Sequence, residues 1–284
     1  MMGAHHAACG AAAWVALTTR VDVNLAAVAA HVPFLPQTIS LGSGQLEVGP
    51  AGVVTGALVT AGAALVPDAD HHNSSIAHSL PPLSNLMCAG VGTLSGGHRH
   101  GSHSIAGAAA FTAVALIAGL WTIETELFGT VFPGAALLSV LLTAFAAKAL
   151  RIIPDGLKKS PWAVGLGVGA FIALFAPEQP FWFPIAVGTG VVVHILGDML
   201  TTGGCNLLWP VRFKPPKELA ALPAVKGIWR PNGYLAVPVL GNAGSIREWT
   251  LLVPVGLYAM FGVGAAMVSM GKSGLSTLAV MAGL

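Results

Sequence analysis

His194 and Asp198 are four residues apart near the end of an apolar run over residues 181–200. On a helix, residues i and i+4 lie on one face, so the imidazole and the carboxylate are expected to project together. A charged side chain at the bilayer centre costs about 3 kcal/mol on insertion scales. Such a pair is tolerated where it faces a polar pocket or binds a cation. It is therefore the first candidate for chemistry in this chain.

Two further polar clusters offer matching groups, at residues 67–72 and 98–103, and each adjoins a long apolar stretch. In the first cluster, Asp68 and Asp70 follow a proline that ends the preceding apolar segment, and His71 extends the same surface. Both carboxylates can approach one ion, or one can bind it while the other orients a neighbouring imidazole. Carboxylates and imidazoles at helix ends indicate a metal centre.

The second cluster supplies two more imidazoles. His98 and His103 flank Gly101, which lets the loop bend both rings toward a common point. Histidine and aspartate without cysteine favour zinc, with manganese or iron as alternatives, over a structural thiolate site. The candidates exceed the three or four ligands of one catalytic zinc, so one or two ions are expected. A metal pair would activate water and stabilise charge on a phosphoryl or acyl oxygen.

Composition places the chain in a membrane. It is 55% hydrophobic and 8% charged, with a mean hydropathy of +0.77, whereas a soluble domain carries roughly a quarter charged residues. The net charge of +2 is too small to indicate a nucleic-acid partner. Cys9, Cys88 and Cys205 are odd in number and lack CxxC spacing, which indicates neither disulfides nor a thiolate site. The N-terminus lacks the cationic start of a signal peptide, so we expect it to be retained.

The apolar runs predict an all-α, polytopic transmembrane helix bundle. They cover residues 4–19, 50–66, 104–123, 131–150, 162–176, 181–200 and 250–270. A span needs about 20 apolar residues, so seven spans are expected, or six if 162–176 is re-entrant or the N-terminal helix does not cross. We expect residues 1–284 to form one integral membrane domain. A motif loop at 67–103 and an insert at about 204–248 would lie outside the bilayer.

Charge asymmetry predicts the orientation in the cell membrane. Lysines and arginines concentrate in segments 148–159 and 212–247, whereas the opposite side receives only Arg20 and Lys272. The positive-inside rule then places the N-terminus, the motif loop and the insert in the cytoplasm, and the C-terminus outside. This argument uses no histidine, yet it puts nine of the ten histidines on the cytoplasmic side, all except His31. The metal site is therefore expected to be cytoplasmic, with membrane lipids as neighbours.

At these residues the chain resembles the YdjM-like, LexA-regulated, membrane-bound metal-dependent hydrolases. The matching blocks, in chain order, are His6 with Gly10; Pro67, Asp68, Asp70, His71 and Ser74; Gly97, His98, Arg99, His103 and Ser104; and His194, Asp198, Thr201, Gly204, Trp209 and Pro210. A weaker match pairs Gly241 with Glu248. The sequence departs from the pattern at Ser102, where threonine is usual, and in its larger apolar content between residues 104 and 181.

The resemblance implies roles for individual residues. The metal ligands would be His6, Asp68, Asp70, His71, His98, His103, His194 and Asp198. The catalytic residues would be Asp70, Asp68 and Arg99, supported by Thr201, Ser102 and Glu248. Arg99 could clamp a phosphate, because a guanidinium matches that geometry, or it could pair with an aspartate. Thr201 could instead only cap its helix. His5, His72 and His100 are not typical of the family, so their place in the site is open.

Two classes of function follow. The resemblance implies a membrane-embedded metal-dependent hydrolase, and a distant similarity to zinc-dependent phospholipases C points to a phosphoester or lipid substrate. The alternative is a divalent-metal transporter or a metal-binding membrane sensor, because a His-x-x-x-Asp pair in a helix also suits an ion pathway. The candidate ligands gather at span ends beside turns, and no second polar set lies on the outer side, which favours the enzyme. The oligomeric state is left open.

Overall fold

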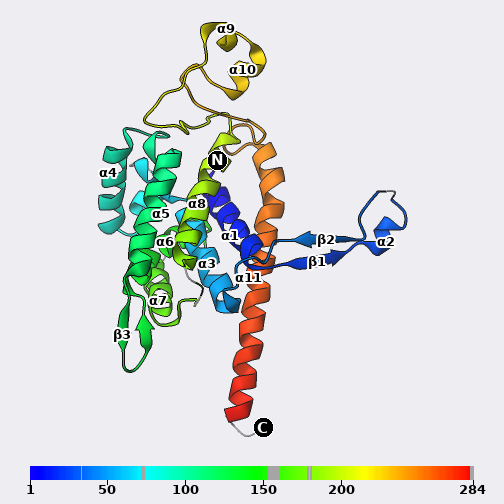
Figure 1. Ribbon diagram of the computed structural model, residues 1–284, viewed down its shortest axis with the longest axis vertical. Helices are drawn as coiled ribbons and strands as arrows, with labels where there is room; N and C mark the ends of the chain where they lie inside the picture. The colour runs from blue at the N-terminus through cyan, green and yellow to red at the C-terminus, as the bar shows by residue number, and fades with distance from the viewer. Residues whose placement is uncertain (33, 72–73, 153–159, 178, 180, 282–284) are drawn as a thin grey trace.

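The computed structural model describes residues 1–281 except 33, 72–73, 153–159, 178 and 180 (Figure 1). It is an all-α membrane bundle. Its long helices are α1 (Gly3–Thr18), α3 (Gly49–Ala63), α5 (Ile105–Leu120), α6 (Pro133–Ala149), α7 (Ser160–Phe175), α8 (Trp182–Met199) and α11 (Ile246–Met281). Each expected apolar run forms one of these helices, so the predicted helical bundle is confirmed.

The helices differ in whether their length suffices to cross a bilayer. Three described segments are long and apolar enough: Gly49–Asp70, in which α3 continues into a 3-10 turn, Trp182–Met199 and Ile246–Ser273. Shorter apolar helices cover Ile105–Leu120, Pro133–Ala149 and Pro161–Phe175. Since about 20 residues span the hydrocarbon core, the number of spans stays a prediction.

The segment expected as a motif loop is partly helical. It contains 3-10 turns at Val66–Asp70, Ser75–His78 and Gly101–His103, and the helix α4 (Leu83–Ser95). Residues 83–95 contain neither a charged residue nor a proline, and α4 ends at Gly96, whose φ of 70° suits a glycine cap. The polar clusters on both sides therefore enclose an apolar helix that the sequence reasoning did not separate.

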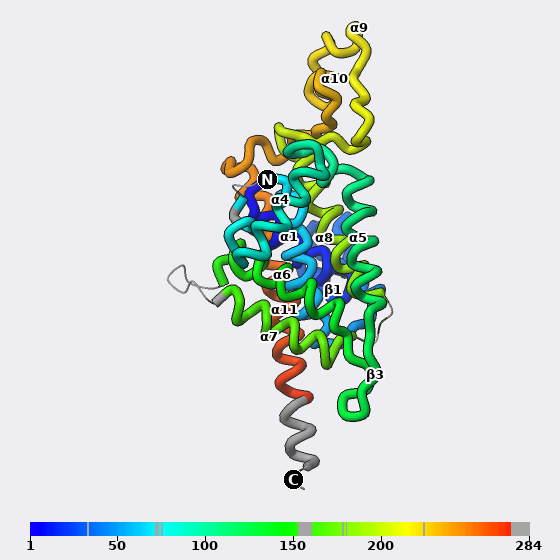
Figure 2. The backbone as a smooth tube through the Cα atoms, turned by 90° about the vertical axis from the view of Figure 1, so that its left-hand side faces the viewer, coloured from blue at the N-terminus to red at the C-terminus, as the bar shows by residue number. Residues whose placement is uncertain are grey.

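The remaining elements are short. They are the antiparallel ribbons β1 (Val21–Asn24) with β2 (Thr38–Leu41) and β3 (Ile123–Thr125) with β4 (Gly129–Val131), and the helices α2 (Ala26–Ala29), α9 (Lys217–Ala220) and α10 (Pro223–Ile228). The insert with α9 and α10 forms one end of the molecule (Figure 2), and α11 extends to the other end (Figure 1). The N-terminus lies nearer the insert (Figure 1).

Helix α3 lies at the centre and packs against α1, α6, α8 and α11. Two glycines allow the closest of these approaches. A Cβ added at Gly10 on α1 would lie 2.7 Å from the Thr60 carbonyl oxygen, and one at Gly190 on α8 would lie 2.5 Å from the same oxygen. Gly10 is one turn after His6, and Gly190 is one turn before His194. The same contacts that join three helices therefore set the separation of these two histidines.

This packing predicts that Gly190→Ala destabilises the protein. The added methyl group collides with backbone atoms of α3, and such overpacking costs typically about 1–3 kcal/mol. The matched control is Gly167→Ala in α7, where an added Cβ meets no atom within 4 Å. Alanine is the better helix former by up to about 1 kcal/mol, so the control should keep or raise the unfolding temperature. Thermal unfolding of both variants in the same detergent measures this, and equal temperatures would contradict the packing account.

The predicted topology is tested with single cysteines at positions 226 and 272, in a background with Cys9, Cys88 and Cys205 replaced by serine. Lys226 lies in α10 of the insert, and Lys272 lies in α11, two residues after the apolar run expected at 250–270. We expect a membrane-impermeant thiol reagent to label position 272 on intact cells and position 226 only after the membrane is opened. Labelling of both positions from one side would refute the seven-span topology.

Candidate metal centre

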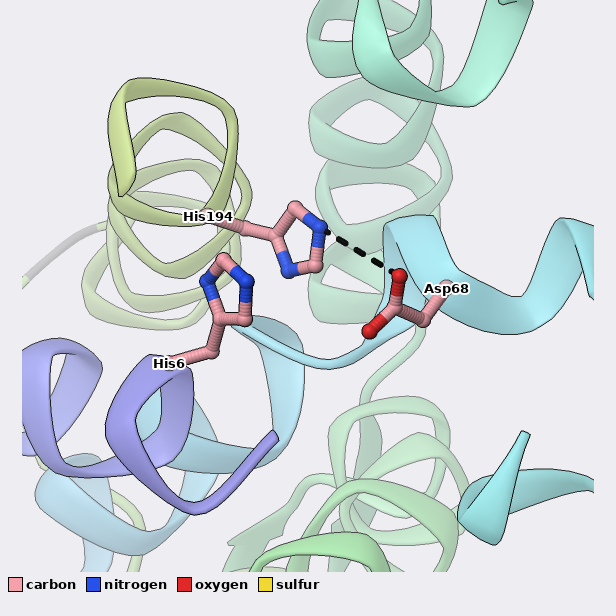
Figure 3. A group of neighbouring side chains, drawn as sticks. All are labelled: His6, Asp68 and His194. Atoms are coloured by element: carbon pink, nitrogen blue, oxygen red, sulfur yellow. Dashed lines mark ion pairs between the residues drawn. The ribbon is translucent and has the colours of Figure 1, made fainter. Parts of the chain in front are cut away.

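Three chain segments bring their polar side chains together beside α3 (Figure 3). His6 comes from α1, His194 from α8, and Asp68 from the 3-10 turn that follows α3. One donor atom from each of these residues lies within 4.8 Å of the other two. Pro67 near the start of the turn cannot supply a helical N–H, which helps to end the α-helix where Asp68 is needed.

The centre of the cluster consists of two imidazoles and two carboxylates. The Nε2 atoms of His103 and His194 are 3.0 Å apart. Asp68 Oδ1 lies 3.7 Å from His103 Nε2 and 3.6 Å from His194 Nε2. Asp198 Oδ2 lies 3.6 Å and 4.0 Å from the same two nitrogens. A tetrahedron with zinc–ligand bonds of about 2.0–2.1 Å has edges of about 3.4 Å, so each of these separations suits two ligands of one ion.

The hydrogen bonds on the other side of each ring assign the tautomers. His194 Nδ1 donates to the carbonyl oxygen of Ala64, at 2.7 Å. His103 Nδ1 lies 3.3 Å from Asp70 Oδ2 and 3.0 Å from Ser102 Oγ, whose own proton goes to Asp70. Both Nδ1 atoms therefore carry hydrogen, and in the neutral rings both Nε2 atoms present lone pairs to each other.

Asp70 organises the 98–103 segment around His103. Its Oδ1 lies 2.7 Å from His98 Nδ1, and its Oδ2 accepts from the backbone N–H of Arg99, at 2.9 Å, and from Ser102 Oγ, at 2.7 Å. Burial alone lowers the pKa of His103, but hydrogen bonds and charge from Asp68 and Asp70 raise it to about 9. Asp70 thus orients the ring of His103, while Asp68 faces the metal-binding side of that ring.

Asp198 is buried and has positive groups at both oxygens. Arg99 Nη2 lies 3.2 Å from Oδ2, and the Met1 amino group lies 2.7 Å from Oδ1. His6 Nε2 is 3.3 Å from Oδ1, and the His6 ring stacks on that of His194 with centroids 3.7 Å apart. Asp198 therefore joins His6 and Arg99 to the central pair, and the sequence alternative that Arg99 pairs with an aspartate is realised here.

The other expected residues lie around this centre. The ring of His71 is 5.2 Å from that of His98, whose side chain is 43% exposed. These two histidines form the open edge of the site. Thr201 Oγ1 donates to the Asp198 carbonyl oxygen, at 2.8 Å, and caps the end of α8, as the simpler interpretation of Thr201 anticipates.

Glu248 and His5 form a separate buried pair. Glu248 accepts from His5 Nδ1 and from the backbone N–H groups of Met2 and Gly244, so it supports the start of α1 rather than binding the central imidazoles. Successive helix residues point about 100° apart, which is why His5 faces Glu248 while the next residue faces Asp198. His72 lies outside the described residues.

The donor set fits a divalent cation. Two lone pairs at 3.0 Å repel each other unless a proton or a metal ion lies between them. Without an ion, a proton on His103 Nε2 would face both His194 Nε2 and Asp68 Oδ1, and Asp68 and Asp70 raise the pKa of His103 accordingly. A cation in place of this proton would bind the lone pairs of both nitrogens with a carboxylate beside them. Imidazole and carboxylate are donor types that several divalent metals accept, so the identity of the metal stays a prediction.

The described residues contain two groups of at least three potential metal ligands, and both include His194. One group is His6, Asp68 and His194, the other is His103, His194 and Asp198, and the geometry therefore indicates one centre around His194. Asp70, His98 and His71 lie on the far side of the His103 ring or at the edge. Their expected roles as direct ligands stay a prediction.

A helical membrane protein with a buried His/Asp cluster that could hold a metal ion is the class that the fold and the site define. The model of the YdjM inner membrane protein family matches residues 1–270, and the chain belongs to that family. No curated protein and no solved structure matches it.

Some contributors to the site were not anticipated. The Ala64 carbonyl fixes His194, but a backbone acceptor leaves no mark in a sequence. Gly203 leaves room for the Arg99 guanidinium, because a Cβ at this position would lie 1.6 Å from Arg99 Nη1. The paired glycines 203 and 204 after α8 were a visible signal for this close approach. Asn206 is buried, and its backbone N–H donates to the Arg99 carbonyl oxygen.

The geometry predicts that purified protein binds one zinc ion and that His194→Gln loses it. The matched control is His78→Gln, because His78 is exposed and lies outside the cluster. Elemental analysis after dialysis should give about one zinc per chain for wild type and control, and near zero for His194→Gln. Equal zinc content in the two variants would contradict this assignment.

Proposed function

We propose that this protein is a membrane-embedded, metal-dependent hydrolase that acts on a phosphoester, with a lipid-type molecule as substrate. The observation that carries the proposal is the pair of Nε2 atoms 3.0 Å apart, with both Nδ1 atoms already on acceptors. Such a pair, with two carboxylates beside it, supports a bound divalent cation. A cation held by imidazoles and carboxylates lowers the pKa of bound water and polarises a phosphoryl oxygen.

The chain's own residues then have distinct tasks. His103, His194 and Asp198 would hold the ion and leave a position for water, and Asp70 would keep His103 in its ligating tautomer. Asp68 is 28% exposed, in contrast to the buried His194 and Asp198, so the site opens to a substrate on the side of Asp68 and His98. Asp68 is also the carboxylate best placed to take a proton from an attacking water there.

Arg99 supports the choice of a phosphoester. Its guanidinium has five N–H donors, and its described contacts use Nη2 toward Asp198 and Nη1 toward the Gly204 carbonyl oxygen. Several donors therefore remain for an anionic oxygen beside the ion. Such a group can stabilise the charge that develops on phosphoryl oxygens in the transition state.

The transporter alternative is supported less well. An ion pathway needs successive sites across the membrane, whereas in the described part of the chain both potential ligand groups share His194. The cluster also lies at helix ends and turns: His6 is near the start of α1, His194 and Asp198 are near the end of α8, and Asp68 and His103 are in turns. This arrangement favours one static centre over a path.

The proposal predicts metal-dependent turnover of a phosphoester panel by the protein in nanodiscs. A chelator should abolish turnover and zinc should restore it. Asp70→Asn keeps the size of the side chain but removes the charge that orients His103, and loss of such a partner costs about 10–100-fold in metal affinity or activity. Asp198→Asn should lower zinc occupancy itself, because a carboxylate beside both Nε2 atoms is lost.

The control is Asp22→Asn, which removes a carboxylate from the exposed β1 strand and should leave turnover unchanged. Zinc flux into proteoliposomes is measured in parallel. Flux by the wild type without hydrolysis of any ester in the panel would decide for the transporter.

A further inference from the structure

A second polar cluster lies where the insert meets the 98–103 segment. His100 Nε2 is 3.1 Å from Arg212 Nη2 and 3.2 Å from the Tyr234 hydroxyl. His100 is one of the histidines that the resemblance leaves without a role. Its neighbours His98 and Arg99 contact Asp70 and Asp198, so this cluster adjoins the metal centre through three consecutive residues.

The cluster has more donors than acceptors. An arginine can only donate, so His100 Nε2 is the acceptor and its ring proton is on Nδ1. One lone pair cannot accept fully from both Arg212 and Tyr234. His100 Nδ1 is buried without a hydrogen-bond partner among the described residues, and so is the Nε atom of Arg230, four residues before Tyr234. An anion with several acceptor oxygens beside His100 Nε2 would accept from Arg212 and from the Tyr234 hydroxyl.

The insert holds Arg212 and Tyr234 side by side. Phe213 stacks on Trp229 with ring centroids 5.3 Å apart, and the Trp229 indole N–H donates to the Phe213 carbonyl oxygen, at 2.6 Å. Trp229 also forms a bridge with Leu235. Trp229 therefore links Phe213, which follows Arg212, to Leu235, which follows Tyr234. The two donors are therefore positioned by packed structure, although Arg212 itself is exposed.

The insert carries an excess of positive charge. Residues 204–247 contain six lysines and arginines and one acidic residue, Glu218. In the described part of the chain, the ion pairs within 4 Å involve none of these six. Electrostatic attraction of anions to the insert follows from this excess, and the fixed donors at His100 give it one defined position.

We propose that Arg212, Tyr234 and His100 form a binding subsite for a phosphate group at the mouth of the metal centre. Its place beside Arg99 makes it a subsite for a second phosphate or headgroup phosphate of the substrate, and this interpretation rests on the proposed hydrolase function. The binding of a phosphate group at this subsite does not depend on the hydrolase function. The phosphate can belong to a membrane lipid headgroup or to a free phosphate compound.

The test measures binding to full-length protein in phosphatidylcholine nanodiscs, with and without a chelator. The probes are inorganic phosphate, by equilibrium dialysis, and phosphatidylglycerol mixed into the disc, by native mass spectrometry of retained lipid. Arg212→Gln should weaken binding by about tenfold, which is about 1.4 kcal/mol, and Tyr234→Phe should weaken it in the same direction. The matched control is Lys226→Gln, which removes the same charge from an exposed position in α10 and should change binding less than about twofold because exposed charges are screened.

Phosphate binding that survives the chelator identifies a free phosphate compound as a ligand, and selective retention of phosphatidylglycerol alone identifies a lipid headgroup; both support the subsite. Equal weakening by Arg212→Gln and Lys226→Gln, or no binding of either probe, would overturn it. If the wild type binds a phosphate probe but hydrolyses no phosphoester, the result counts against the proposed hydrolase and leaves the phosphate subsite supported.

Discussion

The close approach of α1 and α8 to the backbone of α3 is the constraint on which the site depends. Gly10 and Gly190 face the same carbonyl oxygen, that of Thr60. In a lipid bilayer the hydrophobic effect does not drive helices together, so close packing at small residues is a main source of helix association. Four residues after Thr60, directly after α3, the carbonyl oxygen of Ala64 accepts a hydrogen bond from His194 Nδ1 and orients its ring. Helix packing and imidazole orientation are thus parts of one arrangement, so a shift of either helix would move a candidate metal ligand.

The two polar clusters lack opposite kinds of group. At the metal centre, the lone pairs of His103 and His194 meet the carboxylates of Asp68 and Asp198, so a cation would complete the set. At the insert, the donors of Arg212 and Tyr234 share one acceptor among the described residues, His100 Nε2, so an anion would complete that set. Adjacent sites for a cation and an anion are a physically consistent pair for a substrate that carries phosphate.

Sequence reasoning anticipated the helices and the meeting of distant motifs, because apolar length and the His194–Asp198 spacing are local signals. It did not separate Asp68 from Asp70. Their division between the two sides of the His103 ring depends on a 3-10 turn whose direction is set by tertiary contacts. It also left His5 open, since only the position of Glu248 shows which of two consecutive histidines faces the cluster. The helix α4 was hidden between polar segments, and the link between His100 and the insert depends on a contact over more than a hundred residues.

X-ray absorption at the zinc edge of the purified, zinc-loaded protein tests the central claim most directly, because it reports the atoms around the ion. The account predicts nitrogen and oxygen ligands only, at about 2.0–2.2 Å, with the multiple-scattering signature of two or three imidazoles. In His194→Gln this imidazole contribution should be reduced or the zinc lost. A shell of sulfur at about 2.3 Å, or a zinc environment unchanged by His194→Gln, would contradict the assignment of this cluster as the metal centre.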